Sequence, residues 1–140
     1  MAFRRRALMP PWNIGVLLLI ALGVLAIPYR LRKKELGCLK GRVSIGIEEL
    51  YERYYANSGL SKASVSEIWN EIATTLRVPP EKLRPTDRFG EDIGLYFGPS
   101  DRLDTLSQLA SKRARRRQLN VRLAAFRTVD DYVRALADPA

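Results

Sequence analysis

One long uncharged segment near the N-terminus constrains this chain more than any other feature. The 23 residues from Ala7 to Tyr29 carry no charge, and their densest apolar part is IGVLLLIALGVLAI at 14–27. A helix of 23 residues is about 34 Å long, which exceeds the roughly 30 Å hydrocarbon core of a bilayer. Trp12 and Tyr29 lie near its two ends, where interfacial aromatic residues occur. The segment predicts a single transmembrane helix within residues 1–29.

Basic residues surround this segment and predict its orientation. Residues 1–42 hold nine Lys and Arg against one acidic residue, whereas residues 43–140 hold 15 against 14. Three arginines precede the apolar run and six basic residues follow it, which favours a cytoplasmic C-terminal side. We therefore expect a single-pass protein of the cell inner membrane. The cations expected to contact anionic lipid headgroups from a juxtamembrane linker are Arg30, Arg32, Lys33 and Lys34.

A cleaved signal peptide is the alternative reading of the N-terminus. Arg4–Arg6 would form its basic region, residues 14–27 its apolar region and residues 24–26 a small-residue cleavage site. The protein would then be secreted. A mature chain that begins near Ile27 would have to translocate a dense basic cluster first, so the anchor is the favoured interpretation.

Residues 43–140 have the apolar periodicity of a small helical bundle. Helices are expected at 47–56, at 64–78, at 101–117 and from Thr128 onward. The clearest of them is 64–78, where apolar residues recur every three or four positions and would form one stripe along a helix. That stripe consists of Val65, Ile68, Trp69, Ile72 and Leu76.

Two capping boxes and one loop complete the predicted all-α fold. Ser64 with Glu67, and Thr128 with Asp131, fit the capping-box pattern at helix starts. Residues 79–99 would form a long loop pinned by single apolar side chains. The predicted divisions are a basic segment and transmembrane helix at 1–29, a basic linker at 30–46, a short amphipathic helix at 47–60 and a helical domain at 61–140.

The composition argues against an enzyme. The chain has no histidine, which removes the commonest metal ligand and the commonest general base. Cys38 is its single cysteine, so no internal disulfide can form. No metal-ligand spacing, nucleophile triad or phosphate-binding glycine loop occurs. We therefore expect a non-catalytic protein without a metal.

Three stretches of the helical domain, in the right order, resemble an acyl carrier protein. IWNEIATTLRVPPEKLRPTDRFGEDIG at 68–94 is similar to that family's first helix and loop. DRLDTLSQLA at 101–110 is similar to the start of its second helix, and RTVDDYVRAL at 127–136 to its last helix. The resemblance covers about residues 64–137 and implies a small helical bundle.

The resemblance also implies that the prosthetic group of that family is missing. Carrier proteins attach 4′-phosphopantetheine to a serine that follows an aspartate, and Arg102 occupies the matching position here. Arginine has no hydroxyl, so no arm can be attached at that position. Ser100, two residues earlier, is either a displaced attachment site or, as we favour, the N-cap of the next helix.

The second half of the helix at 101–117 predicts the partner. Carrier proteins are recognised through an acidic second helix, whereas this one is basic, so we expect an acidic protein partner. The predicted partner- or lipid-binding residues are Arg102, Lys112, Arg113, Arg115, Arg116 and Arg117. Nucleic-acid binding is the alternative, although no aromatic residue is interleaved there. The sequence thus predicts a membrane-anchored, non-catalytic, carrier-like interaction module.

Overall fold

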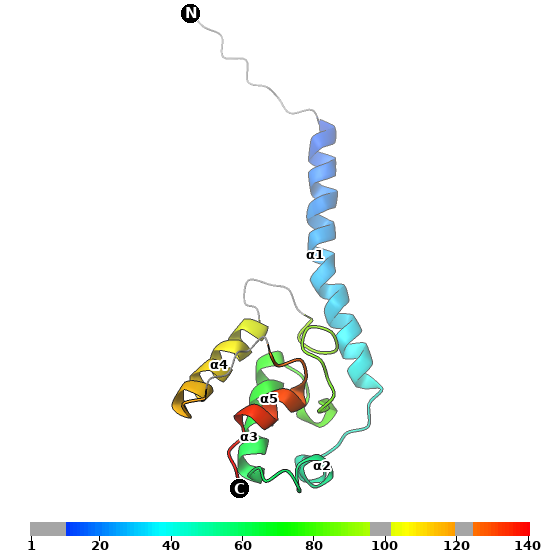
Figure 1. Cartoon of the computed structure of the whole chain (residues 1–140). Coiled ribbons are helices and arrows are strands. Elements are labelled where there is room, and N and C mark those ends of the chain that lie inside the picture. The colour runs from blue at the N-terminus through cyan, green and yellow to red at the C-terminus, as the bar shows by residue number, and fades with distance from the viewer. Residues whose placement is uncertain (1–10, 96–101, 120–124) are drawn as a thin grey trace, which may run out of the picture.

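The computed structural model describes residues 11–95, 102–119 and 125–140, and it is helical (Figure 1). Its elements are α1 (Pro11–Lys40), α2 (Ile47–Tyr54), α3 (Lys62–Leu76), the 3-10 helix η1 (Pro80–Lys82), α4 (Arg102–Arg116) and α5 (Val129–Leu136). Over these ranges, the β-structure is confined to isolated bridges. The predicted all-α, bundle-like character is therefore confirmed for the described residues.

The predicted transmembrane helix is contradicted. Among the residues that the structure describes, no helix is both long enough and apolar enough to cross a membrane. The apolar run at 14–27 is less than half of the 30-residue helix α1. Its 14 residues extend over about 21 Å, short of a hydrocarbon core of about 30 Å. Residues 7–10, which are part of the predicted span, lie outside the described residues.

The C-terminal third of α1 packs against the bundle. Residues 30–40, expected to belong to a basic linker, continue α1 without a break. Glu35 and Leu39 within them are 4% and 2% exposed. These two side chains are four residues apart and therefore lie on one face of a helix. Burying that face against the bundle favours a helix here over a solvated spacer.

Two polar contacts hold this part of the chain to the loop that follows η1. The Gly94 amide donates a buried hydrogen bond to Glu35 Oε1 at 2.8 Å. Arg42 forms an ion pair with Asp87 at 2.7 Å, and Asp87 is 2% exposed. Gly94 has a φ of 73°, and a Cβ built there would lie 2.9 Å from the Leu103 side chain. The contact with Glu35 therefore requires glycine at position 94.

The hydrophobic core forms around α3, and Figure 1 shows α3 beside α4 and α5. The buried face of α3 is the apolar stripe that the sequence periodicity predicts. Leu83 and Ile93 of the long loop are fully buried and join this core. The buried residues that α4 and α5 contribute are Leu106, Ala110, Ala114, Val129, Tyr132, Val133 and Leu136.

Of the two predicted capping boxes, only the second forms. Thr128 Oγ1 accepts from the Asp131 amide at 3.2 Å, and the Asp131 carboxylate accepts from the Thr128 amide at 2.9 Å. The hydrogen bond donated by the Thr128 backbone amide is the main reason why the pKa of Asp131 is lowered. The first box is wrong because α3 begins earlier, with Ser61 as its N-cap. Ser64 instead accepts a hydrogen bond from the Asp138 amide at 2.8 Å.

The docking of α1 predicts a specific effect on stability. Glu35→Ala leaves the buried Gly94 amide without its acceptor. We expect the free energy of unfolding, measured with urea, to fall by about 1–3 kcal/mol. Glu49→Ala is the control, because it removes only an exposed ion pair with Arg53 and should cost at most about 0.5 kcal/mol. Equal losses in the two variants would contradict the docking of α1.

Candidate functional site

α4 and Arg117, which directly follows it, carry six of the ten cations that the sequence singles out. Leu106, Ala110 and Ala114 recur every four positions and are buried. They form one face of the helix, which packs against α3. This packing fixes the rotation of α4 about its own axis. The rotation in turn decides which of its basic side chains face inward and which face solvent.

Arg102, at the position that resembles the attachment serine, contacts the end of α3. Its guanidinium donates to the Leu76 carbonyl oxygen at 3.1 Å. Leu76 is the last residue of α3, and Arg77 after it adopts the left-handed conformation with a φ of 55°. Carbonyl groups in the last turn of a helix lack helical donors, and a nearby cation stabilises them. The contact gives Arg102 a role in joining α4 to α3.

Two further predicted cations also face inward. Arg113 forms ion pairs with Glu67 at 2.7 Å and with Glu71 at 3.1 Å, and both acids belong to α3. Arg117 forms an ion pair with Asp138 at 3.1 Å. The Arg117 guanidinium also donates to the carbonyl oxygen of Leu136, the last residue of α5, at 2.9 Å. These two arginines hold α4 to α3 and to the C-terminal segment.

The remaining three cations of α4 face solvent. Lys112, Arg115 and Arg116 are exposed, and none forms an ion pair with a residue that the structure describes. They are spaced i, i+3 and i+4, so they share one face of the helix. We call these three residues the basic end of α4. The predicted cluster is therefore divided into an inward and an outward set.

The other predicted site residues lie elsewhere. Arg30, Arg32, Lys33 and Lys34 are exposed on α1. Figure 1 shows α4 pointing away from the helix that carries them. Ser100, proposed as an N-cap or a displaced attachment site, lies outside the described residues. The structure therefore gives two separate exposed basic surfaces, one on α1 and one on α4.

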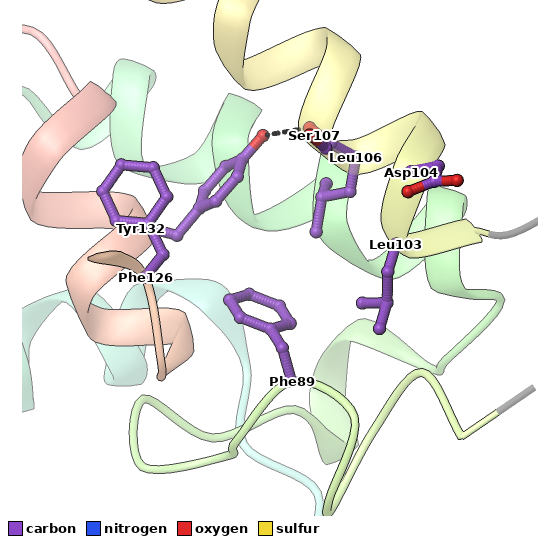
Figure 2. Close-up of a pocket in the computed structure, with 7 residues that line it drawn as sticks. All are labelled: Phe89, Leu103, Asp104, Leu106, Ser107, Phe126 and Tyr132. Carbon is purple, nitrogen blue, oxygen red and sulfur yellow. Dashed lines mark hydrogen bonds between the residues drawn. The ribbon is translucent and has the colours of Figure 1, made fainter. Parts of the chain in front are cut away.

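A pocket of about 250 Å³ opens beside the N-terminal half of α4. Figure 2 shows the side chains of Phe89, Leu103 and Leu106 directed toward a common space, with Phe126 at its edge. Asp104, Ser107 and Tyr132 complete the described lining. Sequence periodicity did not predict this pocket, because its walls come from a loop, from α4 and from the residues around α5. A pocket of this size and lining can accept a small apolar group.

Tyr132 connects this pocket to the inward-facing cations. Its hydroxyl donates to Glu71 at 3.0 Å and makes a longer contact with the Leu106 carbonyl oxygen at 3.4 Å (Figure 2 draws the latter). Burial raises the pKa of the Tyr132 phenol, and the Glu71 carboxylate raises it further. The phenol therefore stays protonated as a donor. Glu71 in turn pairs with Arg113, so one polar network links α5, α3 and α4.

The described groups of the pocket and of α4 suit binding. Of the two hydroxyls in the described lining, that of Tyr132 is already engaged with Glu71, and Ser107 has no histidine to activate it, because the chain contains none. Within the described ranges, no group of His, Cys, Asp and Glu could hold a metal ion. The exposed cations of α4, by contrast, are available for electrostatic contacts with a partner.

Comparisons of the chain with protein-family models, with curated proteins and with solved structures give no match. The likeness to carrier proteins therefore rests on the quoted stretches of sequence and on the order of the helices. Function has to be argued from the geometry of this chain itself.

The division of the cations predicts different effects of similar substitutions. Arg113→Gln breaks a partly buried ion pair with Glu71 and an exposed one with Glu67, and should lower the free energy of unfolding by about 1–2 kcal/mol. Arg116→Gln, three residues later on the exposed face, should change it by less than about 0.5 kcal/mol. Urea unfolding followed by circular dichroism measures both. A larger loss for the Arg116 variant would contradict the orientation of α4.

Proposed function

We propose that this protein is a non-catalytic, carrier-like interaction module that binds an acidic protein surface through the basic end of α4. The observation that carries the proposal is the exposure of Lys112, Arg115 and Arg116 beside arginines that are already paired. Internal ion pairs hold α4 in place, so the three exposed charges are presented in a fixed arrangement. Fixed complementary charges raise association rates and select partners.

The contact made by Arg102 supports a module without a prosthetic arm. The guanidinium at the position of the attachment serine bonds to the end of α3 and so contributes to the packing of α4. A phosphopantetheine arm requires a hydroxyl at that position. The order of α3, the pinned loop, α4 and α5 supports the carrier-like part of the proposal.

The charge balance favours an acidic protein over nucleic acid. Residues 43–140 hold 15 basic and 14 acidic residues, so this part of the chain lacks the large positive excess that the densely charged backbone of a duplex would favour. With Arg113 and Arg117 paired internally, three cations of α4 remain for phosphates. Duplex binding by three contacts would be weak and would have a salt slope of only about −2.7. Protein surfaces can match three charges with a few carboxylates.

The first test asks whether the chain accepts the arm. The full chain, incubated with coenzyme A and a phosphopantetheinyl transferase, should keep its mass, because Arg102 offers no hydroxyl. A true carrier protein in the same reaction is the positive control. A gain of one intact arm that Ser100→Ala abolishes would overturn the proposal in favour of a carrier with a displaced serine.

The second test asks whether the basic end of α4 binds acidic polypeptide. Poly-L-glutamate serves as the probe, and fluorescence anisotropy measures its affinity for the full chain. The variant with Lys112, Arg115 and Arg116 replaced by Gln should bind about tenfold more weakly. The matched control replaces Arg30, Arg32 and Lys33 by Gln and removes the same charge.

A loss of affinity in the control equal to that in the α4 variant would contradict the proposal, because general charge would then explain binding. Tighter binding to a duplex DNA of equal charge would favour the nucleic-acid alternative instead. Both outcomes are read from the same titrations at one fixed salt concentration.

A further inference from the structure

We infer that the apolar end of α1, residues 15–29, inserts into a lipid bilayer that carries anionic headgroups. The inference goes beyond the proposed function, which concerns α4 and a protein partner. It requires the apolar side chains to leave water for hydrocarbon, and it does not require the helix to cross the bilayer. An apolar segment of this length is compatible with a helix that enters the bilayer without crossing it.

The apolar end of α1 is exposed along its whole described length. Nine large aliphatic and aromatic side chains there are between 50% and 72% exposed. They are Val16, Leu17, Leu18, Leu19, Ile20, Leu22, Val24, Ile27 and Tyr29. Figure 1 shows this end of α1 standing clear of the bundle. Soluble proteins rarely expose a contiguous apolar surface of this extent, and such surfaces mark protein or membrane contacts.

A group of cations next to the apolar end identifies the lipid. Arg30, Arg32, Lys33 and Lys34 are exposed directly after it, and we call them the basic collar. Glu35 is the one acidic residue among the first 42, and it is buried against Gly94. The outer surface of this stretch therefore presents positive charge without a neighbouring carboxylate. That arrangement matches the negative surface of an anionic leaflet.

A second copy of α1 is the competing occupant of the apolar end. Parallel pairing of two copies would bring two basic collars together, and like charges at short distance repel. A bilayer accepts the apolar surface and attracts the collar at the same time. The charge pattern therefore favours lipid over self-association.

The docking of α1 sets where the bundle would lie. Glu35 is eight residues after Ile27, which is about 12 Å along a helix, so the loop bonded to Glu35 would lie close to the headgroups. Figure 1 shows the C-terminal end of α4 farther from the apolar end of α1 than its N-terminal end. Insertion would therefore leave the basic end of α4 on the aqueous side.

A fluorophore at two positions tests insertion. Cys38 is the single cysteine and is exposed, so it can be labelled with an environment-sensitive dye in the full chain. A second protein carries Cys38→Ser with Leu19→Cys and the same dye. With vesicles of phosphatidylcholine and phosphatidylglycerol, the dye at position 19 should shift to the blue and be quenched by brominated lipid. The dye at Cys38 should keep its emission in water.

Charge variants test the collar. Replacing its four residues by Gln should weaken binding to these vesicles by about fivefold for each cation, and should change binding to pure phosphatidylcholine little. Replacing the basic end of α4 by Gln should change vesicle binding less than about twofold, which separates this inference from the proposed function. Vesicle binding with the dye at position 19 still in water would overturn the inference. A dimer in solution that buries position 19 and does not bind vesicles would also overturn the inference. A collar variant that binds vesicles as tightly as the unaltered chain would overturn it as well.

Discussion

The packing of α4 on α3 is the constraint on which the other features of the bundle depend. A stripe of one leucine and two alanines is buried, and this fixes the rotation of α4. Arg113 then reaches Glu67 and Glu71, which are themselves one helical turn apart on α3. Each contact constrains the same rotation, so apolar packing and ion pairing agree. The exposed cations are what remains once these internal contacts are made.

The second constraint joins α1 to the same bundle. Glu35 and the Arg42–Asp87 ion pair both contact the loop that leads toward α4. A buried carboxylate is tolerated when it accepts hydrogen bonds. Glu35 accepts one from the Gly94 amide, and Asp87 accepts one from the Arg84 amide. Through Glu35 and Arg42, the C-terminal part of α1 and the residue after Gly41 are therefore bonded to the loop of the bundle.

Sequence periodicity predicted those features that depend on local spacing. The apolar stripe of α3 and the capping box of Thr128 follow from residues within one helix, and both are present. The division of the basic cluster could also have been predicted, because Arg113 lies three residues after buried Ala110, at the edge of the buried face. The high density of basic residues at 112–117 concealed that periodicity.

Features that join distant residues could not be predicted in this way. The contact between Glu35 and Gly94 spans 59 positions and depends on a left-handed glycine. The interpretation of residues 30–46 as a linker missed it, because charge composition alone does not show which acid is buried. The prediction of a transmembrane helix was wrong because it took all of the uncharged segment, residues 7–29, as apolar, whereas the dense apolar part is only residues 14–27. The pocket in Figure 2 likewise needs three separate segments to meet.

The most direct test of the account measures the exchange of arginine guanidinium protons, on Nη as well as Nε, by nuclear magnetic resonance. The account predicts slow exchange for Arg113 and Arg117, whose guanidinium groups are engaged by carboxylates. Arg115 and Arg116 should exchange at the rate of a free arginine. Equal exchange at all four positions would contradict the claim that helix packing divides these cations into structural and available sets.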